Sequence, residues 1–396
     1  MTTTSRPPHP PHQTYARPDS APLKLSLTRK EDWEAFVYAT DRNEPERLSC
    51  REIGALSTKA LAQYNKRRRV WHANLGPFDT PQCTLLHEQL WDILDSNLQD
   101  GQKVRIAIAV DAFPGLGKTT AMLELAKAFH LREIDAEGPR TDDGDERWPV
   151  CWLPLTGRPT LLGLNRSMLF FYAHPGSRRG QSDDFLERAL DVMKRCETRL
   201  LVIDDLHFLR FPSTNSIELS NHFKRIANTF NLTIIFVGVG LAESGLLTEG
   251  RPPDTGLEVI DHKRSSGDRK LRSAVPSQTA RRTTPFTMNP FLVNSQEGRR
   301  NWRNLLLAIE KKLVLANTGR GMLADALPDY LYERSTGHIG SLMSLINVGC
   351  SRAIRTGREE LTRELLESVK IDGAAEAARK QVAAAIRNGD LRARMT

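Results

Sequence analysis

The stretch VDAFPGLGKTT, Val110 to Thr120, contains most of what a phosphate-binding loop requires. The loop signature is G-x-x-x-x-G-K-[S/T], and here Ala112 replaces its first glycine. Glycines let the backbone approach a phosphate, the lysine reaches the β- and γ-phosphates, and the hydroxyl coordinates Mg²⁺. Ala112 falls where the chain leaves a strand, so we expect a mild change. The predicted nucleotide contacts are Pro114, Gly115, Leu116, Gly117, Lys118, Thr119 and Thr120.

A second motif, LLVIDDLH, consists of four apolar residues followed by two carboxylates. The apolar run predicts a buried strand, whose carboxyl end lies beside the phosphate loop in a parallel sheet. We expect Asp204 and Thr119 to hold Mg²⁺, and Asp205 to orient or deprotonate the attacking water. The alternative is a strand followed by a solvated acidic turn, which the loop upstream makes much less favourable. Together the two motifs predict ATP and Mg²⁺ as cofactors.

Five strand candidates must position these residues, over 104–112, 149–156, 199–207, 232–240 and 283–291. Helical patterns separate them, and this alternation predicts a parallel sheet with helices on both faces. A strand between the loop and the acidic strand is typical of the additional-strand branch of P-loop NTPases. From residue 295 onward the pattern is helical, which predicts an all-helical lid. The expected fold is therefore an α/β P-loop NTPase with a five-stranded parallel sheet and a helical C-terminal lid.

Composition changes suggest the domain limits. The first residues are rich in Pro, His, Ser and Thr, which predicts disorder. A polar, basic run interrupts the strand–helix rhythm and reads as an insertion. The expected regions are a tail at 1–25, helices at 26–100, a nucleotide-binding domain at 101–292 with its insertion at 248–280, a lid at 293–370 and a final helix and tail at 371–396.

The chain has 396 residues, a net charge of +8 and a pI of about 9.3, which favours an anionic partner such as DNA without proving one. Its five cysteines lack zinc or disulfide spacing and fit a reducing cytoplasm. We find no signal peptide and no membrane-spanning apolar run in the sequence. Composition thus favours a cytoplasmic globular protein.

Two basic clusters could contact DNA phosphates without reading sequence. One runs from Lys66 to Arg69 and is followed by Trp71 and His72. The other lies in the insertion. For each cluster taken alone, an ordinary solvated basic surface is somewhat more favoured than a DNA-contacting one. The basic residues of the insertion are Lys263, Arg264, Arg269, Lys270 and Arg272.

Several segments together resemble the AAA+ ATPases of transposition, the TniB/TnsC type. They are GLGKTT, LLVIDDLH, FVGVG, RRTTPFTMNPF and STGHIGSLMSLINVGCSRAI, and the resemblance spans roughly residues 50–370. It implies a bacterial, cytoplasmic protein that binds ATP, forms a homo-oligomer on DNA and recruits a transposase. It also implies that Arg281 or Arg282 reaches the γ-phosphate of a neighbouring subunit, with an ordinary basic surface pair about equally favoured.

Three departures from the AAA+ pattern bear on catalysis. Asp205 replaces the usual Glu and is one methylene shorter. The residues after the fourth strand, Gly238 to Gly240, lack a polar sensor. The lid segment GHIGSL lacks a sensor arginine, although Arg334 lies just before it. The resemblance therefore implies an ATPase, converting ATP and water to ADP and phosphate, that retains binding and turns over slowly.

Two other functions compete with this interpretation. The chain could be a signalling or phage-defence NTPase that acts through protein partners instead of DNA. A metabolic P-loop kinase is disfavoured, because no arginine-rich acceptor lid follows the loop and the helical C-terminal region is large.

Overall fold

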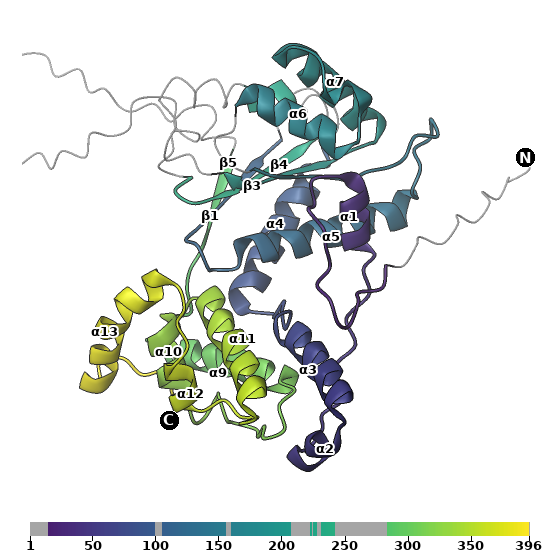
Figure 1. Cartoon of the computed structure of the whole chain (residues 1–396). Helices are drawn as coiled ribbons and strands as arrows, with labels where there is room; N and C mark the ends of the chain where they lie inside the picture. The colour runs from purple at the N-terminus through teal and green to yellow at the C-terminus, as the bar shows by residue number, and fades with distance from the viewer. Residues whose placement is uncertain are drawn as a thin grey trace, which may run out of the picture.

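The five strands form one parallel sheet in the order β2-β3-β4-β1-β5 (Figure 1). We obtained a computed structural model, which describes residues 15–99, 105–155, 160–206, 222–223, 225–227, 231–241 and 283–395. β4 lies between β1 and β3, so the fold is the predicted additional-strand arrangement of P-loop NTPases. The strands are β1 (Ala107–Ala112), β2 (Val150–Pro154), β3 (Leu200–Leu206), β4 (Thr233–Gly238) and β5 (Thr283–Met288).

Helices cover both faces of this sheet (Figure 1). On one face lie α1 (Lys30–Val37), α4 (Pro81–Ser96) and α5 (Lys118–Glu137); on the other lie α6 (Leu161–Phe171), the 3₁₀ turn η1 (Pro175–Ser177) and α7 (Ser182–Arg195). Trp33 of α1 stacks on Trp152 of β2 with ring centroids 5.9 Å apart, which ties the N-terminal segment to the edge of the sheet. α6 was not among the predicted helices, although Thr160 caps it through the Gly163 amide.

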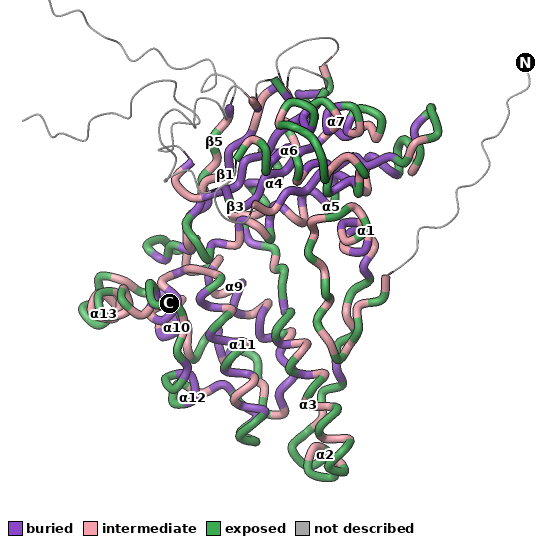
Figure 2. Tube along the Cα trace, turned by 45° about the horizontal axis from the view of Figure 1, so that its top comes forward, coloured by how far each residue is buried: buried purple, intermediate pink, exposed green. Residues whose placement is uncertain are grey.

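A second hydrophobic core lies in the helical part of the chain, where many residues along the tube of Figure 2 are coloured as buried. Trp302, Leu331 and Leu345 are fully buried there. This core confirms the predicted helical C-terminal region. Its helices are α9 (Gln296–Lys312), α10 (Pro328–Ser335), α11 (Ile339–Thr356), α12 (Arg363–Glu367) and α13 (Gly373–Asn388).

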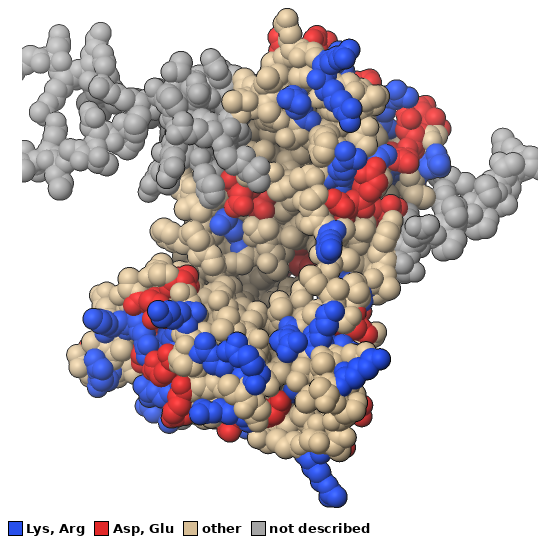
Figure 3. All heavy atoms as spheres, viewed as in Figure 1, with Lys and Arg blue, Asp and Glu red and all other residues tan. Residues whose placement is uncertain are grey.

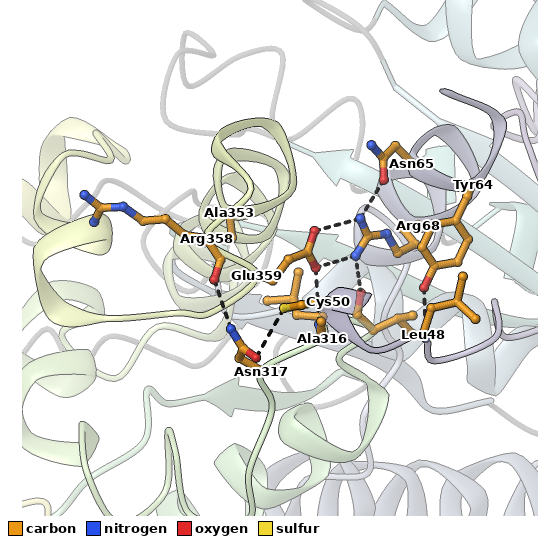
Figure 4. Close-up of polar contacts among 12 residues, drawn as sticks. Leu48, Cys50, Tyr64, Asn65, Arg68, Ala316, Asn317, Ala353, Arg358 and Glu359 are labelled. Atoms are coloured by element: carbon orange, nitrogen blue, oxygen red, sulfur yellow. Dashed lines mark hydrogen bonds and ion pairs between the residues drawn. The ribbon is translucent and has the colours of Figure 1, made fainter. Parts of the chain in front are cut away.

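The N-terminal helices divide between the two cores. α1 and α4 pack on the sheet, whereas α3 (Thr58–His72), which follows the short α2 (Cys50–Ala55), packs against α11. Figure 4 shows Arg68 of α3 pointing toward Glu359, which follows α11. Two hydrogen bonds of 2.5 and 2.9 Å join this buried pair. Residues from near the N-terminus are therefore part of the lid's structure.

The basic cluster on α3 is only partly exposed. Arg68 is fully buried in its ion pair, and His72 is buried with Nε2 accepting a hydrogen bond from the Val314 amide at 2.9 Å. Trp71 donates its indole N–H to the Lys312 carbonyl at 2.7 Å. Lys66 and Arg69 are exposed, and Arg67 is half-buried. This face of the helix therefore packs against the lid, where Arg68 pairs with the buried carboxylate of Glu359.

Within the described part of the chain, no helix has the length and hydropathy of a membrane span.

Candidate nucleotide-binding site

The glycine-rich loop joins β1 to α5 and has the backbone geometry that phosphate binding requires. Gly115 and Gly117 have φ of 80° and 86°, which L side chains rarely adopt. Gly117 is the N-terminal cap of α5, so the free amides and positive dipole end of a 20-residue helix open onto the loop. Ala112 is the last residue of β1, paired in register with Met288. It is not among the residues with positive φ, so no glycine is needed there.

Lys118, the first residue of α5, is a buried cation. Its exposed fraction is 8%, and among the described residues it forms no hydrogen bond or ion pair. Its charge acts on Asp204, whose pKa it lowers slightly against the stronger raising effect of burial. Burying an uncompensated charge is costly, so the position calls for an anion. A phosphate on the loop supplies one.

Thr119 and Asp204 come together at the carboxyl end of β3. The Thr119 hydroxyl donates to Asp204 Oδ1 at 3.3 Å, and the Asp205 amide donates to the same oxygen at 2.9 Å. Asp204 is 3% exposed, and burial raises its pKa. A hydroxyl beside a carboxylate is the oxygen donor set that Mg²⁺ takes when phosphates complete its shell. These residues fit the metal expected at this position.

Asp205 lies at a bulge in β3. Between Ile203 and Leu206 the strand advances three residues while β4 advances two, and Asp205 has φ of 60°. The extra residue turns the Asp205 side chain out to solvent, while Asp204 stays buried. Adjacent carboxylates thus face different environments at one strand end.

The sheet order and loop geometry agree with the family comparison. Residues 102–244 match the family model described as an AAA domain. This part of the chain is an AAA domain. Its fold is that of the AAA+ P-loop NTPases.

Solved structures similar to the chain include ORC and Cdc6 proteins. The ORC2 protein of Aeropyrum pernix, in ADPNP–ADP complexes, has 16% identity and a TM-score of 0.49, covering 80% of this chain and 71% of that one. The ORC1 protein of the same organism, in complex with DNA, has 14% identity and a TM-score of 0.48, covering 81% and 72%. Cdc6p from Pyrobaculum aerophilum has 14% identity and a TM-score of 0.42, covering 79% and 82%. No curated protein sequence gives a significant match.

Beside the loop of the AAA domain lies a mostly apolar cavity of about 240 Å³. Leu116, Gly117 and Thr120 form the wall nearest the loop. The opposite walls come from residues far apart in sequence. They include Phe78, Gln82, Met288, Ile339 and Met343. A cavity of this kind suits a flat aromatic base whose phosphates lie on the loop.

The lid reaches the AAA domain through the start of α11. Gly340 donates its backbone N–H to the Gly115 carbonyl at 2.7 Å. A Cβ on Gly117 would lie 3.5 Å from Ile339 Cγ2, so the lid touches both loop glycines. The sequence drew attention to GHIGSL only as part of a resemblance. Its contact with the loop became visible only in the folded chain.

Two positions considered as sensors from the sequence have other roles in the structure. A Cβ on Gly238 would lie 2.2 Å from the Leu206 carbonyl oxygen, so β4 ends where no side chain fits. Arg334 is 1% exposed and bonds the Tyr330 hydroxyl, the carbonyls of Leu366 and Val369 and the Glu376 carboxylate. It therefore holds α10, α12 and α13 together and does not face the loop.

Arg281, Arg282, His207 and the insertion at 248–280 lie outside the described residues. Their predicted roles stay predictions.

Sequence reasoning missed Gln82 and the cavity it lines, because a single glutamine in an amphipathic helix carries no local signal. It also missed three arginines at 29, 166 and 178, which only the fold brings together.

Proposed function

We propose that this protein is an ATP-dependent DNA-binding regulator. The observation that carries the nucleotide half is Lys118, a buried cation without a described partner, at the start of a helix that follows two positive-φ glycines. The phosphates would take the amides of residues 114–120, with Lys118 as the point charge. Thr119 and Asp204 would hold Mg²⁺, which neutralises phosphate charge when bound. The base would enter the adjacent cavity.

Hydrolysis would depend on Asp205. Its exposed carboxylate, turned out of the strand by the bulge, could accept a hydrogen bond from water at the strand end. An aspartate reaches less far than a glutamate, and position 238 at the end of β4 has no room for a polar side chain. Both features favour slow turnover. A long-lived ATP state suits a protein whose bound nucleotide acts as a switch.

A basic groove at the sheet edge supports the DNA half of the proposal. Basic and acidic side chains are intermixed over the helical part of the face in Figure 3. In contrast, the groove of about 800 Å³ beside the end of β2 has no carboxylate among its lining residues. Its exposed cations, Arg29, Arg166 and Arg178, form no ion pair with any described residue. Exposed guanidinium groups without a carboxylate partner are well suited to bind the phosphodiester groups of DNA.

The groove lies next to the end of β3 that carries Asp204, the proposed metal ligand. Pro154, the last residue of β2, lines the groove, and the next residue, Leu155, donates its amide to the Asp204 carbonyl at 3.0 Å. A ligand that moves the end of β2 would therefore act on Asp204. DNA binding in the groove and nucleotide binding at the loop would then change each other's affinity through the contact between β2 and β3.

The remaining parts of the proposal rest on the resemblance to the TniB/TnsC type. They are homo-oligomer formation on DNA, an arginine at 281 or 282 acting on the neighbouring subunit, and recruitment of a transposase in the bacterial cytoplasm. A transposase gene adjacent to this one would identify the partner to test.

The test is fluorescence anisotropy of labelled duplex DNA with and without ATP and Mg²⁺. We expect ATP to tighten binding and affinity to fall steeply with salt, because phosphate contacts release counterions. Lys118→Ala should abolish the ATP response, whereas the exposed Lys59→Ala on α3 should not. ATP binding without any DNA binding would favour a signalling or defence NTPase that acts through protein partners.

A further inference from the structure

Phe170 is a large aromatic side chain that stays exposed at the end of α6. Its exposed fraction is 42%, whereas the next residue, Phe171, is fully buried. The ring of Phe170 therefore lies on the outer face of the helix, away from the core. A single exposed ring is common on protein surfaces, so its surroundings decide what it can bind.

The surroundings of Phe170 are cationic. Phe170 and Arg166, four residues apart and so on one face of α6, both line the groove beside the end of β2. Arg29 lies over the Phe170 ring, with its guanidinium carbon Cζ 4.5 Å from the ring centroid, and Phe170 keeps its 42% exposure although Arg29 covers part of the ring. Arg178 completes the set of groove cations. The groove thus offers an accessible aromatic surface beside three positive charges.

The other lining residues of the groove compete little with Phe170 and the arginines for a ligand. Trp152 is 1% exposed and stacked on Trp33, so its ring is already covered. Ser177 adds one small hydroxyl. The remaining polar side chains each make a hydrogen bond within the protein. They are Ser167 to the Gly163 carbonyl at 2.9 Å, His174 Nδ1 with the Gly176 amide at 3.0 Å, and Thr28 with the Ser26 hydroxyl at 2.9 Å.

Positive charges and an aromatic ring recognise different parts of a nucleic acid. Guanidinium groups bind the phosphates of a duplex or of a single strand, whereas an aromatic ring stacks on the face of a base. In a duplex the neighbouring bases cover those faces, so the ring can stack only on an unpaired base. The groove has a volume of about 800 Å³, the size of a site for a small organic molecule, so it holds nucleotides of one strand and not the width of a duplex.

We propose that this groove binds an unpaired strand of DNA, with a base stacked on Phe170 and the neighbouring phosphates on Arg29, Arg166 and Arg178. This deepens the proposed function, on which it rests, by naming unpaired DNA as the form that the groove prefers. The arginines contribute to the affinity for any DNA, because phosphates are present in both forms. Phe170 contributes only where a base is free to stack, so this one side chain sets the preference.

The experiment compares a labelled single strand of DNA of mixed sequence with the duplex formed by the same strand. Fluorescence anisotropy gives both dissociation constants for the full-length protein in ATP and Mg²⁺ at one salt concentration. The wild type should bind the single strand at least about fivefold more tightly, the lower end of the contribution of one stacked base. In Phe170→Leu, which keeps an apolar side chain and removes the ring, the ratio should fall to near one. Leu162→Ala, equally exposed on α6 but outside the groove, should keep the wild-type ratio.

Phe170→Leu keeps all the groove arginines, so its affinity for the duplex should stay at the wild-type value. If the wild type bound the duplex as tightly as the single strand, the inference would be wrong while the proposed DNA binding stood. The same would follow if Phe170→Leu lost affinity for both forms equally, or kept the wild-type preference. If the wild type bound neither form, the DNA half of the proposed function would fail and the inference with it.

Discussion

Gly340 of the lid and Gly115 of the phosphate loop are in direct backbone contact. The Gly340 N–H donates to the Gly115 carbonyl at 2.7 Å. A Cβ added to Gly340 would lie 2.9 Å from both Cα and O of Gly115, closer than real Cβ atoms approach a backbone. Gly340 must therefore lack a side chain for this arrangement of loop and lid to exist.

Gly340→Ala should separate the lid from the loop and weaken ATP binding by about tenfold. The extra methyl group meets backbone atoms, which cannot move aside as a flexible side chain can. Titration with a fluorescent ATP analogue measures the effect. Gly54→Ala is the matched control, because a Cβ there meets nothing within 4 Å. Equal affinities for the two variants would show that the contact does not matter for nucleotide binding.

Asp205→Asn should leave ATP binding intact and lower single-turnover hydrolysis by about 100-fold, the usual contribution of a positioned base. The side chain keeps its size and loses its charge at the bulge of β3. Phosphate release after rapid mixing measures the rate. Asp191→Asn, exposed on α7, should retain the wild-type rate. Unchanged hydrolysis in Asp205→Asn would assign the water-positioning role to another residue.

Reversing the three groove charges, with Arg29→Glu, Arg166→Glu and Arg178→Glu together, should weaken DNA binding by more than about tenfold. It should also lower the slope of log affinity against log salt by about three, one for each lost phosphate contact. The control is a triple variant with the same net charge but with its substitutions at exposed positions outside the groove. It carries Arg51→Glu, Arg69→Glu and Arg355→Glu. If both triple variants lost affinity equally, only total charge would matter and the groove would have no special role.

His72 should make the lid sensitive to acid. Burial, followed by the nearby charge of Arg68, lowers the pKa of His72 to about 3. The unfolded chain binds this proton near pH 6.5 and the folded chain does not, so the free energy of unfolding falls as pH decreases from 6.5 toward 3. At pH 5 the loss amounts to about 2 kcal/mol. Urea unfolding at pH 7 and pH 5 measures this fall in the free energy of unfolding. In His72→Gln the fall between the two pH values should be smaller by about 2 kcal/mol. An identical loss in both proteins would contradict the assignment.

The strands could be predicted because each is a short apolar run with a distinctive end. β3 is buried from Leu200 to Asp204, and β1 leads into a loop whose glycines need positive φ. α6 escaped prediction, although Thr160 caps it and its buried side chains include Leu164 and Met168. The burial of Arg68 within the Lys66–Arg69 cluster could not be predicted, for a different reason. Whether an arginine is solvated or buried depends on a carboxylate 291 residues away, and local sequence does not contain that information.

By itself the sequence determined the fold class and the residues at the phosphate loop and the acidic strand end. Those properties follow from local periodicity, glycine conformational freedom and the common edge that parallel strands share. Only the tertiary structure decided which lid glycine meets Gly115, where Asp205 points, and which arginines line one groove. These relations join residues distant in sequence, so packing determines them and no local pattern records them.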